Sequence, residues 1–128
     1  HIRYSFPVVA FGREISDIRL EFKRGAVVKA SAGKNEEFLH KMLGADAGAR
    51  RLGELGIGMN QGITQFTRSI LFDEKIGGTV HLALGRSYPS SGGRNISALH
   101  WDMIKDLRRG GELYFDGTLV QRDGRFVL

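Results

Sequence analysis

Three side chains in the second half of the chain have the chemistry of metal ligands: His81, His100 and Asp102. His100 and Asp102 are two residues apart, so both side chains point to one face of a β-strand. His81 lies in Thr79-Val-His-Leu-Ala-Leu84, an apolar run that predicts another strand. Two imidazoles and a carboxylate on strands form a donor set that zinc, cobalt or manganese accepts. A strand histidine is more often a hydrogen-bonded core or surface group, so the pattern alone leaves both interpretations open.

Two further residues have the right chemistry but weaker sequence signals. Glu54 is followed by Gly56 and Gly58, which permit close approach of another part of the chain. A lone glutamate is nevertheless more often a surface charge than a ligand. Tyr88 precedes Pro89, and a tyrosine there normally packs with its hydroxyl at the surface. Neither residue is assigned to a site by its local pattern.

The elements that must position these side chains begin with an antiparallel meander. Residues 2–6 and 18–22 alternate apolar and polar side chains, and residues 26–30 follow a turn at Lys23-Arg-Gly25. This alternation predicts strands with one buried face. A strand that starts almost at residue 1 suggests that the chain is cut from a longer protein, because domains usually begin with a few loose residues.

The hydrophobic period then changes to that of a helix. Asn35 is predicted to cap a helix with an apolar stripe, which Gly44 ends. His40 lies off that stripe and is predicted to be a surface residue. Asp46 is predicted to cap a second short helix that reaches Leu52. Residues 61–72 have apolar side chains at three- and four-residue spacing, which indicates a helix or a looser amphipathic connector.

The end of the chain predicts a final sheet region. Asp116-Gly117 is a strong hairpin signal between residues 112–115 and 118–120, and Asp123-Gly124 turns the chain into residues 125–128. We therefore predict an α+β fold in one domain over residues 1–128: a mainly antiparallel or mixed sheet with two or three helices inserted mid-chain.

Composition narrows the classes of protein. The chain has 128 residues, 41% hydrophobic and 26% charged, as in ordinary globular domains. It has no cysteine, which excludes disulfides and thiolate metal sites. No apolar run approaches the roughly 20 residues of a membrane helix, so we expect a cytoplasmic protein without a membrane partner. The net charge of +5 is dispersed, which favours a solvated surface over nucleic-acid binding.

Four segments occur together in one order. They are Leu52-Gly-Glu54-Leu-Gly-Ile-Gly58, Ile70-Leu-Phe-Asp-Glu74, Val80-His81-Leu-Ala-Leu-Gly-Arg-Ser-Tyr88-Pro and Leu99-His100-Trp-Asp102. The ordered set resembles the C-terminal part of the thermophilic-type metalloaminopeptidases, the aminopeptidase T family. The resemblance covers most of the chain and is clearest from about residue 48 to residue 106.

The resemblance implies a dinuclear metal site. In that family two Glu, two His, an Asp and a Tyr hold two divalent ions. The resemblance implies the ligands Glu54, His81, Tyr88, His100 and Asp102, with catalytic roles for Glu54 and Tyr88. The ions would be zinc, cobalt, manganese or magnesium. The other family Glu belongs to a segment upstream of the matched region, and the glutamates of the meander, Glu14 and Glu21, lack its flanking pattern.

The resemblance also implies a reaction and partners. The reaction is hydrolysis of the N-terminal peptide bond of a peptide, and the partners are that peptide, an N-terminal domain outside this chain and a second copy in a homodimer. Without the upstream Glu, we expect weak metal binding and little peptidase activity from the chain alone. Two alternatives stay open: a non-catalytic binding or assembly domain of the same fold, and a basic nucleic-acid binder.

Overall fold

The computed structural model describes residues 1–127, beginning with five short strands. These are β1 (Ile2–Arg3), β2 (Val8–Ala10), β3 (Arg13–Ile15), β4 (Arg19–Lys23) and β5 (Ala26–Ser31). Strands β1, β4 and β5 form one antiparallel sheet with β4 in the middle, and β2 pairs with β3. The β4–β5 turn has Arg24 and Gly25 at positive φ, the conformation that a tight two-residue hairpin requires. The predicted antiparallel pairing of the strands around residues 2–6, 18–22 and 26–30 is confirmed, but the first strand ends at Arg3 and β2 and β3 form a separate hairpin.

Helix α1 (Glu36–Leu43) packs its apolar stripe on this meander. Leu39, Met42 and Leu43 are buried, and the helix ends at Gly44 as predicted. The predicted cap differs, because the Asn35 side chain makes no capping hydrogen bond and donates to a backbone carbonyl of the β2–β3 hairpin instead. His40 is exposed, as expected.

The middle of the chain has less helix than the sequence predicts. Residues 46–50 form turns, so the second helix predicted to begin at Asp46 is absent. The stretch 61–72 is mostly irregular, and its only helical turn belongs to α2 (Ile70–Asp73). A buried carboxylate explains the irregular part: Asp73 accepts hydrogen bonds from the backbone and hydroxyl of Thr67, which ties the loop to the helix end in place of a helical ladder.

Three longer strands form the central antiparallel sheet: β6 (Leu52–Ile57), β7 (Thr79–Gly85) and β8 (His100–Asp106). β7 lies between the other two. The 3-10 turn η1 (Pro89–Ser91) lies in the connection from β7 to β8. The strands predicted around His81 and His100 are therefore neighbours.

A small antiparallel sheet ends the fold. It contains β9 (Glu112–Phe115), β10 (Thr118–Arg122) and β11 (Arg125–Phe126). Asp116 and Gly117 have positive φ in the β9–β10 turn, so the predicted hairpin is confirmed. The last strand is shorter than the predicted 125–128, and Leu128 lies outside the described residues.

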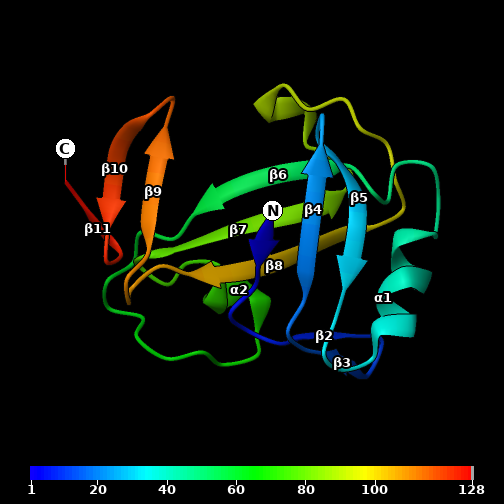
Figure 1. Cartoon of the computed structure of the whole chain (residues 1–128), viewed down its shortest axis with the longest axis horizontal. Coiled ribbons are helices and arrows are strands. Elements are labelled where there is room, and N and C mark those ends of the chain that lie inside the picture. The colour runs from blue at the N-terminus through cyan, green and yellow to red at the C-terminus, as the bar shows by residue number, and fades with distance from the viewer. Residues whose placement is uncertain (128) are drawn as a thin grey trace.

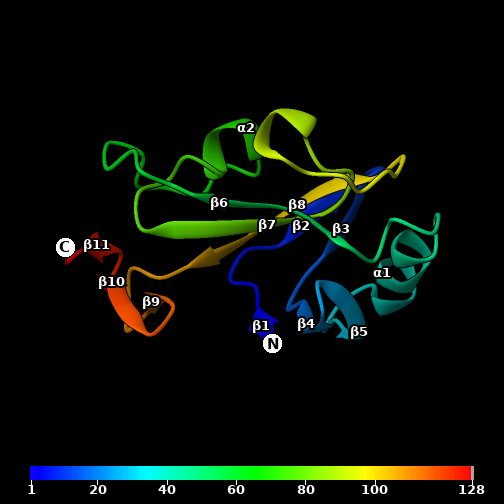
Figure 2. The same ribbon diagram turned by 90° about the horizontal axis from the view of Figure 1, so that it is seen from above.

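The central sheet separates two layers. Figure 1 shows β6, β7 and β8 crossing behind the steeply inclined β4 and β5. In Figure 2, β1, β4 and β5 lie on one side of this sheet, and α2 lies on the other. The hydrophobic core fills the first side, where Leu84, Trp101 and Met103 of the central sheet join buried residues of β4, β5 and α1. The opposite face is left for polar side chains.

The fold class is therefore α+β, with several small antiparallel sheets and fewer helical residues than predicted. Within residues 1–127, no helix has both the length and the apolar character needed to cross a membrane.

Candidate metal centre

Strand register brings the predicted ligands to one face of the central sheet. Ala83 of β7 is paired with Glu54 on one side and with Asp102 on the other. His81 lies two residues from Ala83 along β7, and His100 lies two residues from Asp102 along β8. Directly paired residues share a face and side chains alternate along a strand, so these four polar side chains all point away from the hydrophobic core.

A β-bulge decides where Glu54 points. The β6–β7 register shifts between Leu52 and Glu54: Leu52 pairs with the core residue Leu84, whereas Glu54 pairs with Ala83. Leu52 and Glu54 are two residues apart and would point to the same face in a regular strand. The extra residue is Gly53, where an added Cβ would lie 2.5 Å from the carbonyl oxygen of Gly85. The bulge therefore turns Glu54 toward the polar face, and it needs glycine at this position.

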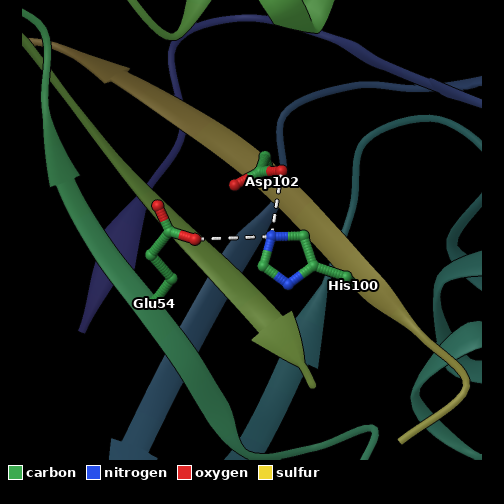
Figure 3. Close-up of side chains that lie close together, drawn as sticks. All are labelled: Glu54, His100 and Asp102. Carbon is green, nitrogen blue, oxygen red and sulfur yellow. Dashed lines mark ion pairs between the residues drawn. The ribbon is translucent and has the colours of Figure 1, made fainter. Parts of the chain in front are cut away.

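The Glu54 carboxylate lies between two imidazoles. Its Oε1 is 3.4 Å from Nε2 of His81, and its Oε2 is 3.5 Å from Nε2 of His100. Nε2 of His100 is also 3.5 Å from Oδ2 of Asp102. Figure 3 shows Glu54, from β6, and Asp102, from β8, converging on His100 of β8 across the intervening strand β7. The three distances exceed ordinary hydrogen-bond lengths and leave room between the donor atoms.

The two histidine rings are positioned differently. Nδ1 of His100 lies 2.8 Å from the carbonyl oxygen of Arg86. We assign the proton to Nδ1, which donates to this carbonyl and leaves the lone pair of Nε2 toward the carboxylates. The His81 ring packs against Gly56, its paired residue in β6. An added Cβ at Gly56 would lie 2.2 Å from Nε2 of His81. The ring therefore lies against a residue that has no side chain.

Glu74 joins the site, and the sequence analysis missed it. It follows α2, and one oxygen of its carboxylate lies within 4.8 Å of donor atoms of His81 and Asp102. Donor atoms of Glu54, His100 and Asp102 form another such group, in which all three atoms lie within 4.8 Å of one another. Asp102 belongs to both groups. The available signal was the position of Glu74 in Ile70-Leu-Phe-Asp-Glu74, one of the four segments that carry the family resemblance.

The electrostatics of the site suit a cation. Burial raises the pKa of Asp102, the positive forms of His100 and His81 oppose this effect, and the negative charges of Glu74 and Glu54 add to it. Asp102 Oδ1 and His81 Nδ1 are buried with no hydrogen-bond partner within residues 1–127. A divalent cation would stabilise the crowded carboxylates. The donor set, made of carboxylate oxygens and imidazole nitrogens, fits zinc, cobalt or manganese.

Lys75 is the positive side chain beside these carboxylates. Its ammonium forms an ion pair with Glu74. That hydrogen bond, with smaller contributions from Glu54 and Asp102, raises the pKa of Lys75. The lysine therefore offsets part of the negative charge of the site.

Tyr88 lies beside His100. The ring centroids are 4.9 Å apart with planes inclined by 56°, and Tyr88 is 43% exposed. The contact places Tyr88 at the accessible side of the site, and its role as a ligand stays a prediction.

Asp46, predicted to cap a helix, instead holds the segment before β8. Its carboxylate accepts hydrogen bonds from the hydroxyl of Ser97 and the backbone N–H of Ala98. The Ala98 bond, followed by the Ser97 bond, lowers the pKa of Asp46. The carboxylate therefore fixes the chain just before His100.

Residues 1–126 match the family described as thermophilic metalloprotease (M29). The chain belongs to this family. It is 32% identical to aminopeptidase T of Thermus thermophilus over 146 aligned positions, which cover 99% of the chain and 36% of that relative. It is 38% identical to aminopeptidase 2 of Geobacillus stearothermophilus over 94 positions, or 70% of the chain and 22% of that relative.

A solved structure agrees with these matches. The structure of wild-type AmpT from Thermus thermophilus matches with a TM-score of 0.76 and 30% identity, over 99% of this chain and 36% of the solved one. The family assignment made from the four segments is confirmed. The chain spans about a third of the length of its aminopeptidase T relatives.

Proposed function

We propose that this chain is the metal-binding catalytic region of an aminopeptidase that removes N-terminal residues from peptides through a dinuclear site. One observation carries the proposal: two groups of three donors share Asp102 on one face of the central sheet. Glu54, His100 and Asp102 would hold one ion, and Glu74, His81 and Asp102 the other. Zinc, cobalt, manganese and magnesium are the candidate ions.

Such ions, when bound, polarise the scissile carbonyl and lower the pKa of water. The side chains supply the remaining functions. Glu54 is the most exposed of the charged side chains in its group, at 31%, so it has access to substrate and can accept a proton on Oε1 or Oε2. Tyr88 is more exposed still, and its hydroxyl can donate a hydrogen bond to negative charge developing on the carbonyl oxygen.

The complete site would include a carboxylate from outside this chain. The family resemblance implies one more Glu upstream, and the aminopeptidase T relatives are much longer than this chain. We therefore propose an N-terminal region and a homodimer as partners of the working enzyme, located in the cytoplasm. The chain alone would bind metal weakly and have little activity, because a missing ligand weakens at least one ion.

Calorimetric titration with zinc or cobalt tests the proposal. Uptake should be near-stoichiometric, and His100→Ala should abolish binding of one ion, because it removes the only imidazole of its donor group. His40→Ala is the matched control: His40 is exposed on α1 and pairs with Glu36, so uptake should be unchanged. A chain that takes up no metal, or whose metal stoichiometry is unchanged by His100→Ala, would be a non-catalytic domain of the same fold.

Hydrolysis of leucinamide tests the predicted weakness of the chain alone. Slow, metal-dependent turnover is expected, and robust turnover by the purified 128-residue chain would contradict the need for an external ligand. Salt-sensitive retention on DNA or RNA would instead favour the nucleic-acid alternative.

A further inference from the structure

A small apolar pocket opens beside the candidate metal centre. Its volume is about 230 Å³, and its walls come from β2 and the segment before it, from α2 and the loop before it, and from strand β8. The apolar side chains that line it include Phe6, Val8, Phe66, Ile70 and Ile104. Phe6 and Phe66 stack with ring centroids 4.4 Å apart. Pockets for drug-sized ligands are larger, about 300–1,000 Å³, so this one suits a single amino-acid residue.

The pocket is continuous with the metal centre. His100 and Asp102 contribute to its wall. The segment before β2 is fixed beside them, because the backbone N–H of Ser5 donates to the carbonyl oxygen of Ile104 at 3.1 Å. A ligand in the pocket would therefore lie next to two residues of the donor set.

One wall of the pocket contains a buried carboxylate, Asp73, that has no positively charged partner among residues 1–127. Asp73 lines the pocket and is 1% exposed. Its Oδ1 accepts hydrogen bonds from the backbone N–H and the hydroxyl of Thr67, at 2.8 and 2.7 Å. Its Oδ2 is buried and has no partner within residues 1–127. A buried charged oxygen without a donor is costly, so this atom favours a positively charged donor.

The arginine that lines the pocket forms its ion pair with a residue other than Asp73. Arg68 also lines the pocket, but its guanidinium pairs with Glu14 of the β2–β3 hairpin at 3.5 Å. The unpartnered oxygen, the apolar wall and two of the metal donors therefore lie around one pocket.

We propose that this pocket binds the first residue of the substrate, with its α-ammonium group at Oδ2 of Asp73 and an apolar side chain between the aromatic and aliphatic walls. This inference rests on the proposed function. The α-nitrogen of a peptide lies only about 2.5 Å from its first carbonyl carbon, from standard bond lengths and angle. A ligand whose ammonium is held by a carboxylate in the same pocket as His100 and Asp102 would therefore direct that carbonyl toward these two residues. Interior residues of a peptide lack the ammonium, so the pocket selects chain ends.

The test uses two non-hydrolysable probes: leucinol, which carries the ammonium, and isohexanol, the same molecule without its amino group. Binding to the zinc-loaded full chain is measured by calorimetry. The wild type should bind leucinol at least about tenfold more tightly, because a charge-assisted hydrogen bond is stronger than a neutral one. Asp73→Asn should remove most of this difference and leave isohexanol binding within about twofold.

Two controls keep the result interpretable. Thermal unfolding checks that Asp73→Asn is folded. Thr67→Val removes one hydrogen bond to Oδ1 but keeps the charge, so it should retain the preference for leucinol. A third variant, Ile70→Trp, fills the pocket and should weaken both probes together.

Zinc uptake in the same samples separates the two ideas. Zinc uptake without a preference for leucinol, or a preference that survives Asp73→Asn, overturns the pocket assignment and leaves the proposed function intact. A preference lost in Asp73→Asn without any zinc uptake supports the pocket and overturns the metalloenzyme proposal.

Discussion

Gly56→Ala should damage the metal centre without changing a single ligand. Gly56 is paired with His81 across β6 and β7, and the added Cβ would lie 2.1 Å from Cε1 and 2.2 Å from Nε2 of that imidazole. Ordinary contacts begin near 3.4 Å, so Nε2 must move by about 3.4 − 2.2 = 1.2 Å. The tolerance of zinc–nitrogen distances is only about 0.2 Å. The imidazole would therefore leave the coordination sphere.

The expected loss is at least about tenfold in affinity for the ion held by His81, or roughly 1.4 kcal/mol. Zinc calorimetry measures it, with Gly44→Ala as the matched control. An added Cβ at Gly44 meets its nearest atom at 3.4 Å, so that variant should titrate like the wild type.

A double variant tests the assigned cause. In a His81→Ala background the clash is gone, so Gly56→Ala should cause no further loss of metal affinity or of unfolding free energy. Wild-type zinc affinity in Gly56→Ala, or an equal loss of stability with and without the imidazole, would refute the steric argument.

Two further predictions concern stability. The first concerns the metal-free protein, measured in the presence of a chelator, in which burial raises the pKa of Asp102. The protonated Asp102 stabilises the fold below pH 3.8, the ordinary pKa of the group. This stabilisation is lost as the pH rises through the raised pKa. The melting temperature of Asp102→Asn relative to the wild type should therefore rise over that window, and a flat or falling difference would contradict the assignment. Leu84→Ala removes a fully buried side chain of the central sheet and should cost about 2–5 kcal/mol in denaturant unfolding. Leu55→Ala, at an exposed position of β6, should cost less than about 0.5 kcal/mol. Equal costs for the two leucines would contradict the burial assigned to Leu84.

The regular elements could be predicted because their signals are local. Alternating apolar residues predicted β4, the turn at Lys23-Arg-Gly25 predicted that β5 follows it, and a continuous apolar run predicted β7. The helical period predicted α1, whose stripe is buried as expected. The predicted helix from Asp46 failed because that carboxylate bonds to Ser97 and Ala98, about fifty residues away in sequence. No local pattern contains such a partner.

The sequence by itself determined the donor chemistry of the candidate site. It supplied His100 and Asp102 on one strand face and His81 on a second strand, and its ordered segments determined the family. Residue type and short spacing are properties of the chain and need no partner strand.

The tertiary structure alone decided how those donors meet. The bulge at Gly53 turns Glu54 away from the core face that Leu52 takes, and the end of α2 brings Glu74 to His81 and Asp102. Both depend on strand register and on packing between distant segments. A one-residue shift of register moves a side chain to the opposite face of a sheet, so spacing along the chain does not specify which donors meet.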